Sequence, residues 1–302
     1  EDNYEICFDV RYSRYCFYIL FWADVWLSFT DVLILPHKGE LCMKLTILTV
    51  CYNSDATIRD TLESLVHQTD HDFEYIVVDG ASTDRTLGII KEYEDRLPMK
   101  LLSEPDNGLY DALNKGIHMA SGDVVGLLNS DDYYEPTTVQ LVKTYFKENP
   151  SMDFLCGAMR LVTYKKEEIR VVYNQSLECI VYEMPLNEPA TFVRKRVYDE
   201  IGGFNPKYRV SADYDLTCRA YIANKNFKFI SDVLTNMRMG GLSGGGDGGV
   251  QGIRTAIQTA KDDYEIVRLN FGKTYKLRFL KKYILLHLRM LKRYFFKSKR
   301  CR

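Results

Sequence analysis

An apolar run that ends in acids is the feature that most constrains the fold of this 302-residue chain. Residues 124–128 read Val-Val-Gly-Leu-Leu, a pattern typical of a buried strand, and Asn129-Ser130-Asp131-Asp132 follow directly. Open α/β sheets bind ligands at the carboxyl ends of their strands, where these acids would lie. Two adjacent carboxylates and an amide supply oxygen ligands, which suit Mg²⁺ or Mn²⁺. Seen alone, the same pair is also typical of a polar turn or a helix cap.

Strands and helices alternate from Met43 onward. The predicted strands are 44–50, 75–78, 100–102 and 124–128. The predicted helices between them begin at Ile58, with apolar positions Leu62, Leu65 and Val66, and continue at 84–93 and 109–119. Further along, the predicted elements are strands at 154–162, 168–173 and 227–230 and helices at 194–201 and 212–221. This alternation predicts an α/β fold with a mostly parallel, twisted sheet flanked by helices.

Polar residues follow three of these strands. The strand ends are Cys51-Tyr52-Asn53, Asp79-Gly80 and Asn129-Ser130-Asp131-Asp132. In a doubly wound sheet such ends converge on one crevice, so we expect Asp79 and Asp131 to share a cleft. The dinucleotide fingerprint and the Walker phosphate loop are absent, which argues against dehydrogenases and ATPases. Asp79-Gly80 alone is also typical of a plain turn.

Five motifs in order along 43–241 resemble those of the inverting family 2 glycosyltransferases, which have the GT-A fold. The motifs are Thr49-Val50-Cys51-Tyr52-Asn53, residues 77–84, residues 107–123, residues 128–132 and Ser211-Ala212-Asp213-Tyr214-Asp215-Leu216. The stretch Asn107-Gly108-Leu109-Tyr110-Asp111 resembles bacterial members that build exopolysaccharide, capsule or lipopolysaccharide.

The resemblance implies roles for particular residues. Val50 and Tyr52 fall where the family packs the nucleotide base. Asp79 matches the position of the family's carboxylate that hydrogen-bonds the base, which is commonly uracil. Asp131 matches the acid that ligates the metal, with Asp132 beside it. The metal would be Mg²⁺ or Mn²⁺.

The resemblance also implies the reacting end of the site. Asp213 matches the general base and lies in the first turn of its predicted helix, where the helix dipole favours an ionised carboxylate. The residues expected to line the donor-sugar pocket are Asn107, Asp111, Asn114 and Asn129. Solvated positions on the helix are the alternative for the first three.

Two positions depart from the family pattern. Asn129 replaces the first acid of the Asp-x-Asp motif, and Ala212 replaces the Glu before the base. Both departures leave the two carboxylates that the chemistry needs most. Asn129 retains a hydrogen-bonding amide.

The two ends of the chain differ from its middle. Residues 1–42 contain no Met, and we predict that they are a non-native extension upstream of Met43. A membrane anchor is the alternative. Asp24 and Asp31 interrupt the apolar stretch, however, and placing each at the centre of a membrane span would cost about 2.5–3.5 kcal/mol of free energy. The Gly-rich residues 242–249 predict a loop, read either as a mobile lid or as a linker. Eight scattered cysteines predict reduced thiols in a cytosolic protein.

Residues 250–302 predict a basic, helical C-terminal extension. Within it, 273–302 carries twelve Lys or Arg and no acid, with many aromatic and aliphatic side chains. This pattern favours an amphipathic helix on an anionic membrane surface over a packing or oligomer helix, and disfavours nucleic-acid binding.

The sequence therefore predicts a metal-dependent inverting glycosyltransferase on the cytoplasmic face of a bacterial plasma membrane. It would move a sugar from a nucleotide-diphosphate sugar, with UDP preferred, to a cell-surface glycan or an undecaprenyl-linked acceptor. The alternatives are transfer to a polyprenyl phosphate or a protein, and a nucleotide-sugar-binding module without catalysis.

Overall fold

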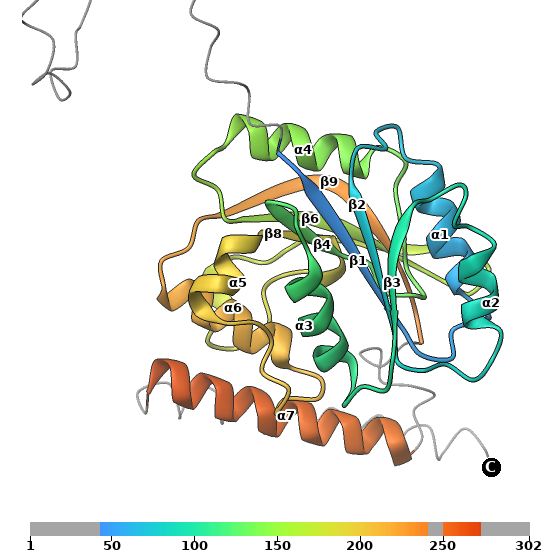
Figure 1. The fold of residues 1–302 in the computed structure, drawn as a ribbon. Coiled ribbons are helices and arrows are strands. Elements are labelled where there is room, and N and C mark those ends of the chain that lie inside the picture. Colours follow the sequence, from blue (N-terminus) through green and yellow to red (C-terminus); the bar gives the residue numbers. More distant parts are fainter. Residues whose placement is uncertain (1–42, 241–249, 273–302) are drawn as a thin grey trace, which may run out of the picture. The chain divides into compact units, whose positions relative to one another are not determined.

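The computed structural model describes residues 43–240 and 250–272 (Figure 1). The strands are β1 (Leu45–Cys51), β2 (Glu74–Asp79), β3 (Met99–Ser103), β4 (Val124–Leu127), β5 (Tyr133–Tyr134), β6 (Phe154–Val162), β7 (Glu168–Val172), β8 (Thr191–Arg194) and β9 (Phe227–Arg238). The helices are α1 (Ile58–Val66), α2 (Thr86–Lys91), α3 (Leu109–Met119), α4 (Thr138–Glu148), α5 (Lys195–Ile201), α6 (Ala212–Ile222) and α7 (Val250–Phe271). Two 3₁₀ turns lie at Leu177–Cys179 and Glu188–Ala190.

The described strands form one sheet in the order β3-β2-β1-β4-β8-β6-β9-β5, with β7 paired to β6. The first four strands run parallel, as do β6 and β9. The remaining pairs are antiparallel, which makes the sheet mixed in its second half. The predicted α/β fold is confirmed. The strands are parallel in the part of the sheet formed by β1 to β4, whose carboxyl ends we predicted to bind the ligand.

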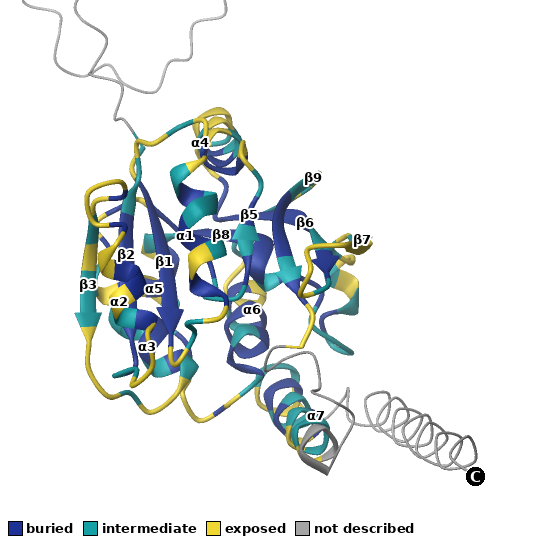
Figure 2. Ribbon diagram, turned by 90° about the vertical axis from the view of Figure 1, so that its right-hand side faces the viewer, coloured by how far each residue is buried: buried dark blue, intermediate teal, exposed yellow. Residues whose placement is uncertain are grey.

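Alternating side chains of the central strands enter two separate cores. Leu48 and Val50 face the helices α3, α5 and α6, whereas Ile47 and Cys51 face α1, α2 and α4. All seven residues of β1 are buried, and Figure 2 shows the central strands as the darkest part of the sheet. Such two-sided burial explains the near-continuous apolar runs in the sequence.

Several elements differ from the sequence-based predictions. Helix α4 and the strands β5 and β8 were not predicted, although Val139, Val142 and Phe146 have the spacing of a buried helical face. Strand β9 continues to Arg238, past the predicted end at 230. Its pairing with β6 shifts register between Cys156 and Ala158, so polar residues within β9 pass through a bulge without ending the strand.

Helix α7 packs against α6 and joins the core on that side of the sheet. Ile266 and Val267 are buried, and the rings of Phe271 and Tyr221 lie 6.1 Å apart. The helix confirms helical structure at the start of the expected C-terminal extension. The predictions for residues 1–42, 242–249 and 273–302 fall outside the described residues.

No helix within 43–240 or 250–272 combines the length and the apolar character that crossing a bilayer requires.

Strand β4 lies close to β8, and we predict that Gly126 is required for this approach. A methyl group at position 126 would overlap the buried Phe192 ring and lie 3.0 Å from the Tyr134 hydroxyl. Gly126→Ala should lower the free energy of unfolding by about 1–3 kcal/mol in a urea titration. The matched control is Gly88→Ala on the exposed face of α2, where a methyl group would meet no atom within 4 Å. That control should leave stability unchanged or raise it by up to about 1 kcal/mol; equal losses in both variants would contradict the packing argument.

Candidate active site

A cleft of about 580 Å³ lies at the carboxyl ends of β1 and β4. The two strands pair in parallel with Leu48 opposite Leu127, so their following loops leave the sheet side by side. The hydroxyls of Ser54 and Ser130 lie 2.9 Å apart and join these loops. The predicted site residues that line this cleft are Val50, Tyr52, Asn129, Asp131 and Asp132.

The acidic pair after β4 has one buried and one accessible member. Asp132 is only 2% exposed, and its Oδ1 accepts a hydrogen bond from the Arg238 backbone N–H at 2.9 Å. Burial and the Asp131 charge raise the pKa of Asp132 to about 7. Asp131 is half-buried, and burial raises its pKa as well.

The donor set at this pair fits a divalent cation that a ligand helps to hold. No cluster of three or more His, Cys, Asp or Glu residues suited to a metal occurs among the described residues. Asp131, however, lines the cleft, and no hydrogen bond or ion pair joins its side chain to another residue in the described part of the chain. Two acids whose ionisation is disfavoured would gain from a nearby cation, and phosphate oxygens or water would complete its coordination.

Asp79 lies behind the wall of the cleft and is fully buried. Its carboxylate accepts hydrogen bonds from the Ser82 backbone N–H at 3.0 Å and from the Ser103 hydroxyl at 2.7 Å. A Cβ at Gly80 would lie 2.5 Å from Asp106 Oδ2 and 3.4 Å from the Tyr52 ring. Asp79 therefore fixes the turn beneath Tyr52, and does not itself line the cleft.

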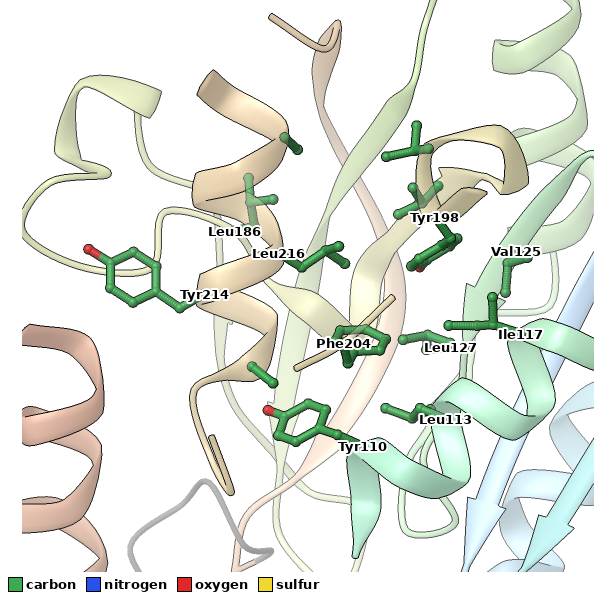
Figure 3. Close-up of a cluster of buried hydrophobic side chains, with 14 of the residues drawn as sticks. Tyr110, Leu113, Ile117, Val125, Leu127, Leu186, Tyr198, Phe204, Tyr214 and Leu216 are labelled. Atoms are coloured by element: carbon green, nitrogen blue, oxygen red, sulfur yellow. The ribbon is translucent and has the colours of Figure 1, made fainter. Parts of the chain in front are cut away.

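Asp213 lies in the first turn of α6 and contacts Tyr110 at the start of α3. The Tyr110 hydroxyl lies 3.2 Å from Asp213 Oδ1 and 2.7 Å from the Val210 carbonyl oxygen. In Figure 3 this hydroxyl points toward the helix that carries Tyr214 and Leu216. Burial raises the pKa of Asp213 to about 6, while bonds from the Tyr214 backbone and the Tyr110 hydroxyl oppose that rise.

The three acids that we expected to meet around one ligand do not line one cavity. Asp131 faces the cleft, Asp79 is covered by the cleft wall, and Asp213 lines a small cavity of about 20 Å³ between α6 and β4. Leu109 lines the cleft, and the next residue, Tyr110, bonds Asp213. The start of α3 therefore adjoins both the cleft and Asp213.

The expected donor-sugar residues separate in the structure. Asn129 lines the cleft, whereas Asn107 and Asp111 line a second cavity beside it. The Asn114 amide bonds both the backbone N–H and the carbonyl oxygen of Phe204, each at 2.8 Å. This arrangement favours a structural role for Asn114 over contact with a sugar.

Glu188 is an acid at this site that our sequence reasoning missed. It lines the small cavity with Asp213, and Asn129 hydrogen-bonds its carboxyl. Burial, followed by the charges of Asp213 and Asp132, raises the pKa of Glu188 to about 8, so it holds a proton at neutral pH. It lies in a 3₁₀ turn that follows an irregular segment, where no periodic pattern signals its position.

Tyr164 is a second residue that the sequence did not reveal. It precedes β7 and lines the cleft. It is 67% exposed, whereas the tyrosines of the core are buried. Tyr52 is 64% exposed in the same cleft. Two exposed aromatic side chains on one cleft are suited to contact with a planar base or a sugar face.

The sequence model described as "Glycosyl transferase family 2" matches residues 46–216. The chain belongs to this family. It is a glycosyltransferase with the GT-A fold, as the five motifs indicated. The matched residues extend from β1 through Asp213 and include the cleft loops after β1 and β4.

Curated relatives of this family 2 glycosyltransferase come from several bacteria. A "PGL/p-HBAD biosynthesis glycosyltransferase" of Mycobacterium bovis is 31% identical over 179 residues, covering 58% of this chain and 69% of the relative. The chondroitin synthase of Pasteurella multocida is 28% identical over 67% of this chain but only 22% of that longer protein.

Solved structures share the fold. S. aureus TarS in complex with UDP-GlcNAc aligns with a TM-score of 0.62 at 23% identity, covering 80% of this chain and 72% of that one. The mannosyltransferase PcManGT of Pyrobaculum calidifontis, in complex with GDP-Man and Mn²⁺, aligns with a TM-score of 0.57 at 15% identity, covering 81% and 74%.

Proposed function

We propose that this glycosyltransferase moves a sugar from a nucleotide-diphosphate sugar, with UDP as the preferred nucleotide, to an acceptor hydroxyl with inversion. The observation that carries the proposal is the cleft at the ends of β1 and β4, with Asp131 facing it. The ligands named for the TarS and PcManGT structures, UDP-GlcNAc and GDP-Man, support a donor of this class.

The nucleotide base would bind at the β1 end of the cleft. Tyr52 offers an exposed ring there, and Val50 forms the apolar floor. Asp79 would act as a positioning residue, because its hydrogen bonds to Ser82 and Ser103 hold the turn on which the base rests. The family resemblance implies a direct hydrogen bond between Asp79 and the base. To form it, Asp79 would have to lose its hydrogen bond from Ser82 or Ser103.

Asp131 and Asp132 would hold Mg²⁺ or Mn²⁺ together with the donor diphosphate. When bound, such an ion neutralises charge that develops on the leaving nucleotide. Asn129 lines the same part of the cleft and would hydrogen-bond the donor through its amide. Asn129 also bonds Glu188, so the donor end of the cleft is linked to the small cavity that Glu188 and Asp213 line.

Asp213 would act as the general base. With a pKa of about 6 its carboxylate is ionised at neutral pH and still basic enough to take a proton from an attacking hydroxyl. The hydroxyl oxygen attacks the anomeric carbon, the bond to the diphosphate breaks, and the proton goes to Asp213. Tyr110 orients the carboxylate through its hydroxyl.

The acceptor would be a growing cell-surface glycan or a lipid-linked glycan at the inner face of the plasma membrane. The name of the M. bovis relative, a PGL/p-HBAD biosynthesis glycosyltransferase, and that of the P. multocida chondroitin synthase support acceptors of this general kind. The twelve cationic residues in 273–302 support a membrane location.

Replacing the proposed base should stop transfer and spare donor binding. Nucleotide release is measured with UDP- and GDP-sugars in Mg²⁺ or Mn²⁺, and donor affinity by calorimetry. Asp213→Asn should lower turnover by about 10²- to 10⁴-fold, because general-base assistance is lost, while the donor Kd stays nearly constant. The control Asp199→Asn alters an exposed acid on α5 that pairs with Lys195, and should turn over normally. Full turnover by Asp213→Asn would refute the assignment and favour a binding module or another base.

The rate should depend on pH through Asp213. Since the base works only when ionised, kcat should be constant above pH 7 and fall as the pH drops through about 6. Tyr110→Phe removes a hydrogen bond that favours the ionised form, so the midpoint of this fall should move to higher pH. Tyr145→Phe, whose hydroxyl bonds the distant Asp232, is the control and should keep the original profile. An unshifted midpoint in Tyr110→Phe would separate Tyr110 from the base.

The basic segment should recruit the protein to anionic membranes. In flotation assays the full chain should rise with vesicles that contain phosphatidylglycerol and stay behind with neutral phosphatidylcholine vesicles. A chain lacking 273–302 should lose this binding. Equal flotation of both forms would count against the segment.

A further inference from the structure

A second cavity, of about 680 Å³, adjoins the acidic cleft. It lies between the start of α3, the loop that contains Pro206 and Arg209, and Thr255 on α7. Asp106, Gly108 and Leu109 line both spaces, so the two cavities meet along the residues that lead into α3. We name this space the α3–α7 cavity.

The α3–α7 cavity is larger than the small cavity that Asp213 lines, and it extends to the residues beside Asp213. Tyr110 and Val210 line it, and the Tyr110 hydroxyl bonds both the Val210 carbonyl oxygen and Asp213 Oδ1. Asp131 lines the other space. A general base must lie within hydrogen-bond reach of the hydroxyl whose proton it takes, directly or through one water molecule. An acceptor hydroxyl in the α3–α7 cavity would come up to Tyr110, the residue whose hydroxyl bonds Asp213.

The side chains of the α3–α7 cavity suit a sugar with several hydroxyl groups. Arg209 is exposed and has no hydrogen bond or ion pair among the described residues. Asp111 Oδ2 accepts from the Asn107 backbone N–H at 2.9 Å, while its Oδ1 has no hydrogen-bond partner in the described part of the chain. A guanidinium with donors to offer and a carboxylate oxygen ready to accept are complementary to neighbouring sugar hydroxyls.

We propose that the α3–α7 cavity is the subsite for the terminal sugar of the acceptor glycan, with Arg209 and Asp111 contacting its hydroxyls. This inference rests on the proposed function, since it takes Asp213 as the base. It also assigns Asn107 and Asp111 to the acceptor, in place of the donor-sugar role that the sequence resemblance implies. The donor would occupy the acidic cleft alone, and the two substrates would meet beside Leu109.

The test separates the two substrates by measuring each on its own. The wild-type chain is first screened with UDP- and GDP-sugars for nucleotide release and with p-nitrophenyl hexosides and N-acetylhexosaminides as acceptors. Arg209→Ala should raise the acceptor KM at least tenfold and leave the donor Kd and the slow hydrolysis of donor in the absence of acceptor unchanged. Arg170→Ala, an exposed arginine on the edge strand β7 outside this cavity, is the matched control and should keep wild-type constants.

A second variant fills the space without removing a polar contact. Thr255→Trp should block transfer to every glycoside while the donor Kd by calorimetry stays at the wild-type value; a thermal melt confirms that the variant folds. Loss of donor binding in Thr255→Trp or Arg209→Ala would overturn the proposal and place the donor in this cavity. An unchanged acceptor KM in both variants would also overturn it. If the wild-type chain neither binds nor cleaves any nucleotide sugar, the proposed function itself is contradicted. This outcome differs from those that contradict the acceptor subsite alone.

Discussion

Burial of the central strands on both faces decides where polar chemistry lies in this protein. Every residue of β1 is buried and its apolar side chains enter one core or the other, so no functional side chain projects into solvent from the middle of that strand. Asn53, Asp79 and the run Asn129-Ser130-Asp131-Asp132 lie at or just after the ends of β1, β2 and β4. Since these strands are parallel and adjacent, their polar ends gather at one edge. The cleft is thus a consequence of the sheet's order, and the loops supply only the details.

Crowding of carboxylates sets the electrostatic character of the site. Asp132 is buried, Glu188 and Asp213 are partly shielded from water, and each of the three has a raised pKa. Keeping acids ionised away from water costs folding free energy, which the two large cores offset. The same shielding strengthens any interaction with a cation or a proton inside the site. A site of this kind is less stable when empty than when it holds a positively charged partner.

The sequence predicted what depends on periodicity and chain order. The apolar runs of β1, β2 and β4 and the acids after them were visible because buried parallel strands leave a clear pattern. Glu188 was not visible, because the irregular segment before it carries no period. The hydrogen bonds of Asn114 to Phe204 join residues 90 positions apart, and no local pattern encodes such a contact. The burial of Asp79 likewise depends on which serines the turn and β3 bring to it.

The phenol at position 110 carries a single hydrogen but has two oxygen neighbours, the Val210 carbonyl and the Asp213 carboxylate. The hydroxyl can donate a well-aligned hydrogen bond to only one of these oxygens at a time. A displacement of the 206–210 loop that lengthened the contact to the carbonyl would turn this hydrogen toward the carboxylate and make the latter a weaker proton acceptor. The position of a surface loop and the basicity of an interior acid are therefore mechanically linked through one rotatable O–H bond.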